Sequence, residues 1–476
     1  MITGAGQLLR VTVQLVSLVV LARLLQPSDF GLVAMTTAVV GVGEVFRDFG
    51  LSSAAIQAKS ISEAQRSNLF WINTGIGIGL ALIAIAFGPL VALFYGEPAV
   101  VALMAACSTT FIANGLATQH RADLNRRLRF GALTLVDTCS QILSVVAAIA
   151  VAVAGGGYWA LVVLTVGQAF LGLIGVVLAA RWVPRWYRRG VRMEQFFRFG
   201  AGLAGSQLLG YASKNVDSVV LGATLGPTAV GFYNRAYQVL ILPLNQFQAP
   251  STRVALPVLS RLSDDRVRYT AFLLRGQTIL LHAVALILAL AASQALPLFD
   301  MVLGPNWRES VPIFQALAAG GLASMANYAC YWVFLSKGLT VSYFWFSLIT
   351  RPVVIAAIVL GALMGGSIGV ALAFSSVSLA LWPITLWWLS RCSDAPVVDM
   401  FVNGSRAFLV YSLAACLSWA STAFLPSDAV PALVLLLIGT TTFAATLALF
   451  ALILPSYRND LHSILDTRRF LRGGGS

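Results

Sequence analysis

Fourteen long and almost uninterrupted apolar segments dominate this sequence of 476 residues. Each has about the 20 residues that a helix needs to cross the hydrocarbon core of a bilayer. Transmembrane strands would be shorter and would alternate apolar with polar residues, so helices are the expected structure. The pattern therefore predicts an all-α polytopic membrane protein of about 14 transmembrane helices. The predicted spans are residues 2–25, 29–47, 69–94, 98–119, 132–154, 157–180, 200–222, 228–250, 271–297, 311–335, 340–363, 367–390, 404–425 and 429–454.

Composition excludes the soluble alternatives. Apolar residues make up 58% of the chain and charged residues only 10%, and the mean hydropathy is +0.84. A chain of this kind cannot cover itself with a polar shell in water. Its five cysteines have no paired spacing, so neither a disulfide framework nor a zinc site is expected. No other metal site and no cofactor is predicted.

The distribution of basic residues predicts the orientation. With the N-terminus inside, 25 of the 31 Lys and Arg residues fall in inner loops and the C-terminal tail, whereas the outer connections hold only Arg23 and Arg308. This asymmetry follows the positive-inside rule and predicts that both termini face the cytoplasm of a bacterial inner membrane. The net charge of +13 then faces anionic inner-leaflet lipid, and a nucleic-acid partner is not expected.

The chain contains an internal repeat at an offset of 200 residues. Residues 7–31 and 207–231 share ten identities without a gap, including Pro27 with Pro227 and Gly31 with Gly231. The offset carries the first span onto the seventh, an even number of crossings, which predicts a parallel repeat of two six-helix lobes with a substrate site between them. The predicted domains are an N-lobe at 1–182, a cytoplasmic linker at 183–199, a C-lobe at 200–391, two additional spans at 392–454 and a cytoplasmic tail at 455–476.

Three segments resemble a known family: "LARLLQPSDFGLVAM" near the N-terminus, "RADLNRRLRF" ending at Phe130, and "DSVVLGATLGPTAVGFYNRAYQVLILPLNQ" from Asp217. They are similar to the polysaccharide-transporter branch of the multidrug/oligosaccharidyl-lipid/polysaccharide (MOP) flippase superfamily, the Wzx-type flippases of lipopolysaccharide biosynthesis, over roughly residues 1–450. The resemblance implies a V-shaped, MATE-like pair of lobes with two extra helices. It also implies transfer of an undecaprenyl-diphosphate-linked oligosaccharide from the inner to the outer leaflet.

Four cations lie within predicted spans: Arg10, Lys214, Arg235 and Arg351. A charged side chain at this depth costs several kcal/mol unless it faces protein or water, which makes each a candidate for binding cargo. Guanidinium groups in a central cavity would bind the phosphates of a lipid diphosphate bidentately.

Each cation also has a structural explanation. Lys214 could pair with Asp217 three residues later, and Arg10 and Arg235 could snorkel to a membrane surface. Arg351 precedes Pro352, where a freed carbonyl could accept its hydrogen bonds.

Three acids are candidates for coupling transport to H⁺ or Na⁺: Glu44, Asp137 and Asp217. Pairing with Arg47 explains Glu44 equally well, and Asp137 lies near the predicted cytoplasmic surface. The chain has no ATP-binding loop.

A flippase for lipid-linked oligosaccharide is the favoured function, with a polysaccharide polymerase and export machinery as further partners. The alternative is a MATE-like drug or cation antiporter, which would need acids facing the cavity. A membrane enzyme would need a large outer loop, and none is predicted. A scaffold within an export complex is the remaining alternative.

Overall fold

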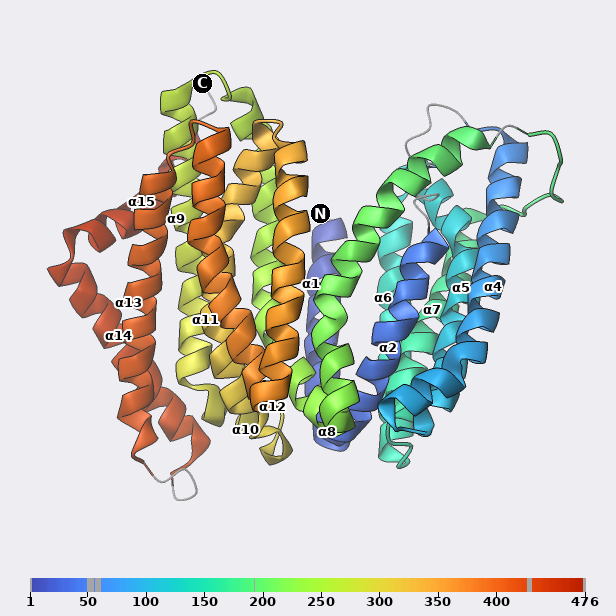
Figure 1. Cartoon of the computed structure of the whole chain (residues 1–476), viewed down its shortest axis with the longest axis horizontal. Helices are drawn as coiled ribbons and strands as arrows, with labels where there is room; N and C mark the ends of the chain where they lie inside the picture. The colour runs from blue at the N-terminus through green and yellow to red at the C-terminus, as the bar shows by residue number, and fades with distance from the viewer. Residues whose placement is uncertain (1, 49–54, 56–60, 192, 426–429, 474–476) are drawn as a thin grey trace. The chain divides into compact units, whose positions relative to one another are not determined.

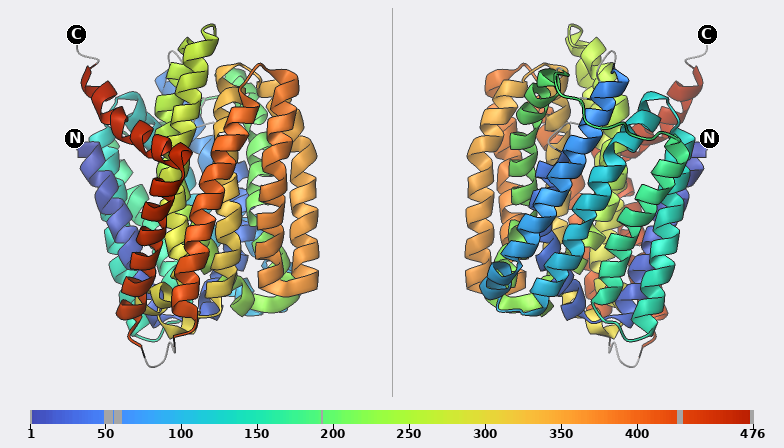
Figure 2. Two further views of the ribbon diagram at one scale, coloured as in Figure 1. Left: turned by 90° about the vertical axis from the view of Figure 1, so that its left-hand side faces the viewer. Right: turned by 90° about the vertical axis from the view of Figure 1, so that its right-hand side faces the viewer.

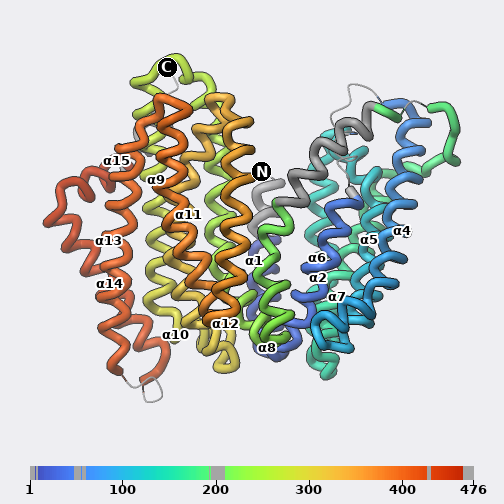
Figure 3. Tube along the Cα trace, in the orientation of Figure 1, coloured from blue at the N-terminus to red at the C-terminus, as the bar shows by residue number. Residues whose placement is uncertain are grey.

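The computed structural model of the chain describes residues 2–48, 55, 61–191, 193–425 and 430–473, and Figure 3 traces the chain with blue at the N-terminus and red at the C-terminus. Apart from one short 3₁₀ turn, the regular elements of these residues are all α-helices. Nine of the described helices are long and apolar enough to cross a membrane. The all-α polytopic fold class predicted from the apolar segments is therefore confirmed.

The helices divide into two units, Met1–Gly231 and Phe232–Ser476. In the first unit α4 packs along α5, α6 packs along α7, and α1 and α2 pack on α6 and α5 (Figure 1). The helices of the first unit are α1 (Ile2–Leu24), α2 (Pro27–Asp48), α4 (Glu63–Tyr95), α5 (Ala99–Arg126), α6 (Phe130–Val153), α7 (Trp159–Ala180) and the first part of α8 (Glu194–Arg261).

In the second unit α11 packs along α12, and α13 packs along both α9 and α14; the left view of Figure 2 faces this unit. The second unit contains the rest of α8, α9 (Arg266–Ser293), α10 (Ala295–Val302), the 3₁₀ turn η1 (Pro305–Trp307), α11 (Ser310–Ser336), α12 (Thr340–Cys392), α13 (Val397–Ala423), α14 (Ala432–Ile453) and α15 (Pro455–Gly473). The predicted tail at 455–476 thus contains a helix.

Glycines interrupt the two longest helices at the junctions of predicted spans. The backbone of α8 leaves helical geometry at Gly226, which has a φ of 78°. The backbone of α12 does so at Gly365 and Gly366, and the latter has a φ of 58°. Only glycine adopts such positive φ values without steric cost. The gap between predicted spans 340–363 and 367–390 coincides with the second break.

The two copies of the repeat meet inside the first unit. A Cβ added at Gly31 would overlap the carbonyl oxygen of Pro227, and a Cβ added at Gly231 would overlap the carbonyl oxygen of Pro27. The contact is reciprocal, because each glycine touches the proline of the other copy. Both prolines begin a helical segment, where a missing N–H costs nothing. Small residues are needed here because two backbones pass within van der Waals contact.

Large apolar side chains cover the outer faces of both units. Leu93, Leu178 and Leu363 are 80%, 70% and 68% exposed, and Leu452 is 78% exposed. Such exposure would be costly in water but suits a surface that contacts lipid tails.

Candidate functional site

Charged side chains from three helices of the first unit meet around Asp137. Arg121 on α5 donates from Nη1 to Asp137 Oδ1 at 2.8 Å, and Arg10 on α1 lies with Nη1 3.5 Å from Asp137 Oδ2. The three side chains retain 38%, 37% and 24% exposure for Arg121, Arg10 and Asp137. Two guanidinium groups thus share one carboxylate, and the cluster carries one surplus positive charge.

Local packing determines where these side chains lie. Gly172 on α7 makes room for Arg121, since a Cβ there would lie 3.2 Å from Arg121 Nη2. Gln141, one turn beyond Asp137 on α6, donates to the carbonyl oxygen of Arg10 and ties α6 to α1. The guanidinium of Arg121 therefore lies between α6 and α7.

A second polar group joins α2 to α5. Glu44 accepts from Arg47 at 3.0 Å and from the Asn114 side-chain amide at 2.6 Å, while Arg47 donates to Thr118 Oγ1 at 2.8 Å. The pairing of Glu44 with Arg47 is one of the two explanations considered for this acid. Glu44 and Arg47 together carry no net charge, in contrast to the cluster around Asp137.

The sequence-based list of candidates misses the α5 partners. Asn114, Thr118 and Arg121 all contact charged groups on α2 or α6. Their spacing of i, i+4 and i+7 places them on one face of a helix that is otherwise mainly apolar. Polar residues at helical spacing within the predicted span 98–119 indicate Asn114 and Thr118, whereas Arg121 lies two residues beyond that span.

The remaining four candidates from the sequence lie on α8 and α12, and not on the helices that meet around Asp137. Lys214 is exposed on α8, whereas Asp217 is 7% exposed and accepts from the Ser218 backbone N–H at 2.7 Å. Arg235 is 4% exposed, donates to Gln238 Oε1 at 3.0 Å and lies over the Trp307 ring at 5.2 Å. Arg351 is half-buried on α12. Buried as it is, Arg235 is held by protein and does not reach open solvent.

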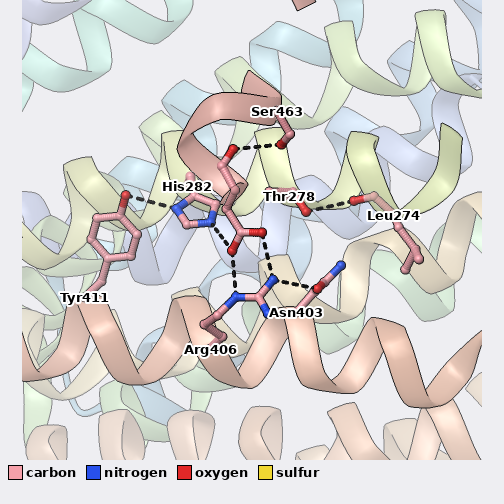
Figure 4. Close-up of polar contacts among 8 residues, drawn as sticks. Leu274, Thr278, His282, Asn403, Arg406, Tyr411 and Ser463 are labelled. Carbon is pink, nitrogen blue, oxygen red and sulfur yellow. Dashed lines mark hydrogen bonds and ion pairs between the residues drawn. The ribbon is translucent and has the colours of Figure 1, made fainter. Parts of the chain in front are cut away.

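The second unit contains a charged cluster that the sequence-based list does not include (Figure 4). Asp460 on α15 accepts two hydrogen bonds from Arg406 on α13, at 2.6 and 2.7 Å, and lies 3.5 Å from His282 Nε2 on α9. The Tyr411 hydroxyl lies 3.1 Å from His282 Nδ1. The Asp460 side chain is only 12% exposed, so this cluster fixes α15 to the rest of the unit.

Opposing effects act on the Asp460 carboxyl. Burial by itself would raise the pKa of Asp460, but hydrogen bonds from His282 and Arg406 and their charges outweigh it and hold the pKa below its usual value. Asp460 is therefore charged under ordinary conditions. Its role is that of a structural ion pair.

Over the described part of the chain no group of three or more His, Cys, Asp or Glu side chains is placed to hold a metal ion. The cysteines described are free thiols. The cluster around Asp137 is thus a partly exposed polar group with a surplus positive charge.

Comparison with known proteins identifies the family. The family model described as "polysaccharide biosynthesis protein" matches residues 20–312, which is more than half of the chain. The lipopolysaccharide biosynthesis protein WzxC of Escherichia coli is 26% identical over 77% of this chain and 75% of its own length. The succinoglycan biosynthesis transport protein ExoT of Rhizobium meliloti is 24% identical over 95% of this chain and 92% of its own length.

A solved structure shares the fold. The lipid II flippase MurJ, in an inward closed conformation, matches 95% of this chain and 99% of its own chain with a TM-score of 0.68. The sequence identity is 16%, so the comparison concerns the arrangement of helices alone.

Proposed function

Because the chain belongs to the polysaccharide biosynthesis protein family, we propose that it is a flippase that moves an oligosaccharide linked to undecaprenyl diphosphate across the bacterial inner membrane by alternating access. The names of ExoT, a transport protein, and MurJ, a lipid II flippase, support transport of a lipid-linked glycan. In this role the chain is a transporter and not an enzyme. It requires no cofactor.

The surplus positive charge around Asp137 is the observation that carries the proposal. A diphosphate head group must lose its hydration to enter a membrane protein, and two guanidinium groups replace part of that hydration with charge-assisted hydrogen bonds. Arg10 and Arg121 are held to Asp137 only in a partly exposed ion pair, which contributes little stability. Exchange of the Asp137 carboxylate for a phosphate is therefore inexpensive.

The same exchange supplies a route for ion coupling. When Asp137 takes up a proton it no longer competes for Arg10 and Arg121, which are then free to bind the diphosphate. Loss of the proton restores the competitor and favours release of the cargo. Among the three candidate acids, Asp137 is thus the one we assign to H⁺ coupling, and Glu44 and Asp217 are assigned structural roles.

The remaining parts of the proposal follow from the sequence. Both termini face the cytoplasm, and lobes at 1–182 and 200–391 move relative to each other during transport. The polysaccharide polymerase that receives the translocated glycan is the expected functional partner. Lys214 and Arg351 are assigned to later steps of cargo passage, whereas Arg235, which is buried against Gln238 and Trp307, is assigned a structural role.

Glycan export in cells lacking the chromosomal gene tests the proposal. Arg10→Gln and Arg121→Gln should each reduce export at normal membrane abundance, and the double variant should abolish it. Each guanidinium contributes hydrogen bonds to a charged group worth about 1.5–3 kcal/mol, which corresponds to about a tenfold to hundredfold loss of affinity. Arg129→Gln is the matched control, since Arg129 is an exposed arginine of the same unit that bonds the Ala179 carbonyl. Normal export by the double variant would contradict the proposal.

Arg351 is tested separately in the same cells. Arg351→Ala should reduce export, and Arg351→Lys should restore part of it if charge in mid-span is what matters. Equal export by both variants and the wild type would assign Arg351 to helix packing beside Pro352.

A further inference from the structure

A cavity of about 550 Å³ opens in the first unit, at the end that the charge distribution predicts to face the cytoplasm. It lies between the beginning of α4, the end of α5 and the segment after α7, and shares no lining residue with the Asp137 cluster. Its polar lining includes Arg66, Gln119, Asp123, Arg126, Arg127 and Trp182. Ligand sites in proteins commonly have this volume.

Four buried side-chain nitrogen atoms of residues that line this cavity have no hydrogen-bond partner among the residues that the structure describes. They are Nε and Nη2 of Arg66, Nε2 of Gln119 and Nε1 of Trp182. Gln119 is only 1% exposed, so its amide cannot obtain its hydrogen bonds from bulk water. A buried donor without a partner costs about 1–3 kcal/mol. All four atoms are donors. One acceptor of the lining, Asp123 Oδ2, also makes no hydrogen bond, but it lies 3.0 Å from Arg127 Nε in an ion pair, so the excess of donors indicates that the missing partner is an acceptor.

The net charge around the cavity is positive, which suits an acceptor that carries negative charge. Asp123 lies between Arg66 at 2.9 Å and Arg127 at 3.0 Å, and Glu63 pairs with Arg185 outside the lining at 3.1 Å. Both acids are thus already neutralised. Arg126 adds a further cation and bonds the Ala55 carbonyl at 2.7 Å. An entering acceptor meets a net positive surface.

The donors are fixed in place before any ligand binds. The Arg66 guanidinium stacks on the Trp182 ring with its Cζ 3.8 Å from the ring centroid, and its Nη1 is anchored to Asp123. A capping box at Ser62 and Gln65 fixes the first turn of α4, which carries Arg66. A guanidinium held on both a ring and a carboxylate loses little further entropy on binding.

We propose that this cavity binds a phosphate group, through Arg66, Gln119 and Trp182. The phosphate belongs either to the head group of an anionic lipid of the inner leaflet or to a soluble cytoplasmic phosphate compound. The site is distinct from the proposed cargo site, and the inference does not depend on the flippase function.

Pyrophosphate is the soluble probe. The thermal melting temperature of the purified full-length protein should rise with pyrophosphate at constant ionic strength. Gln119→Leu and Trp182→Phe each remove one neutral donor without changing the net charge, and Trp182→Phe keeps a ring beneath Arg66. Each should raise the dissociation constant for pyrophosphate about two- to tenfold. Without ligand, Gln119→Leu should melt at the wild-type temperature or above, because an unmet donor is gone.

Nanodiscs containing phosphatidylcholine alone or mixed with phosphatidylglycerol test the lipid source. Stabilisation by phosphatidylglycerol that both variants weaken identifies a lipid head group, and an effect restricted to pyrophosphate identifies a soluble ligand. Arg189→Gln, which removes an exposed charge outside the cavity lining, should leave both responses unchanged. Equal binding by wild type and both donor variants, or no binding of either probe, would overturn the proposal. Neither result depends on glycan export.

Discussion

Asp137 and Asp460 each accept from an arginine and lie near a second cationic or basic side chain, yet the two carboxylates differ in almost every physical respect. Asp460 accepts from Nε and Nη2 of one guanidinium at 2.6 and 2.7 Å, in a site where its side chain is 12% exposed. Asp137 takes one bond of 2.8 Å from Arg121 and a looser contact of 3.5 Å from Arg10, and is 24% exposed. Breaking a tight and buried pair leaves an uncompensated buried charge, whereas breaking a looser and more exposed pair costs little stability. This difference separates a structural cluster from a candidate site.

The largest effect is expected from Arg406→Ala. It leaves the Asp460 carboxylate buried without its main partner, which should lower the free energy of unfolding by about 3 kcal/mol. Because Asp460 lies on α15, limited proteolysis should also cut near α15 sooner. Thermal melting and limited proteolysis of the purified protein measure the two effects. Arg458→Ala, which changes an exposed residue of α15, should have neither effect. If Arg406→Ala is as stable as the wild type, the Asp460 cluster does not have the structural role assigned to it.

The pH dependence of α15 docking should follow Asp460. Its folded pKa is lowered, so its stabilisation is present above the unfolded value of about 3.9 and is lost as pH falls through the folded pKa. Protease sensitivity near α15 should therefore rise only at strongly acidic pH. Asp460→Asn should remove that acid-side step and be less stable at neutral pH. A step near pH 6 that Asp460→Asn retains would assign the transition to another group.

A smaller stability effect is expected from Asp137→Asn. A half-exposed ion pair contributes about 0–1 kcal/mol, so the melting temperature should change little. Export should nevertheless fall sharply, because Asp137 can no longer alternate between competitor and proton carrier. The melting temperature and the glycan export of Asp137→Asn should both be measured on the same membranes. A large loss of stability with normal export would place Asp137 in the same class as Asp460.

The smallest effect is expected from Arg185→Gln. Arg185 and Glu63 form a pair whose side chains are 63% and 51% exposed, so the free energy of unfolding should change by less than about 0.5 kcal/mol. Thermal melting at low and high salt checks this value. If Arg185→Gln lowers the free energy of unfolding as much as Arg406→Ala does, the exposure of an ion pair does not predict its contribution to stability.

The helices were predictable from the sequence because lipid imposes a long apolar segment on every span. The gap between predicted spans 340–363 and 367–390 was visible for the same reason, and the structure breaks α12 there at Gly365 and Gly366. The pairing of Glu44 with Arg47 was also accessible, since both lie on one helix three residues apart.

Contacts between helices were not predictable in the same way. Arg121 reaches Asp137 from another helix, and only the packing of α5 and α7 against α6 brings the two together. The Asp460 cluster depends on α15 folding back onto α9 and α13, and no local pattern in the tail predicts where a helix will dock. The unmet donors of Arg66, Gln119 and Trp182 likewise come from three separate segments.

The reciprocal contact of Gly31 with Pro227 and of Gly231 with Pro27 bears on how such a chain could arise. In a two-fold homodimer a surface patch meets its own copy, so that residue i touches j while j touches i. The Pro–Gly corners of the repeat have this form within a single polypeptide. It is the contact expected if two identical subunits became joined by gene duplication and fusion. Each glycine contacts the backbone of the other copy. A larger residue at either glycine would therefore clash with atoms that no side-chain substitution in the other copy removes.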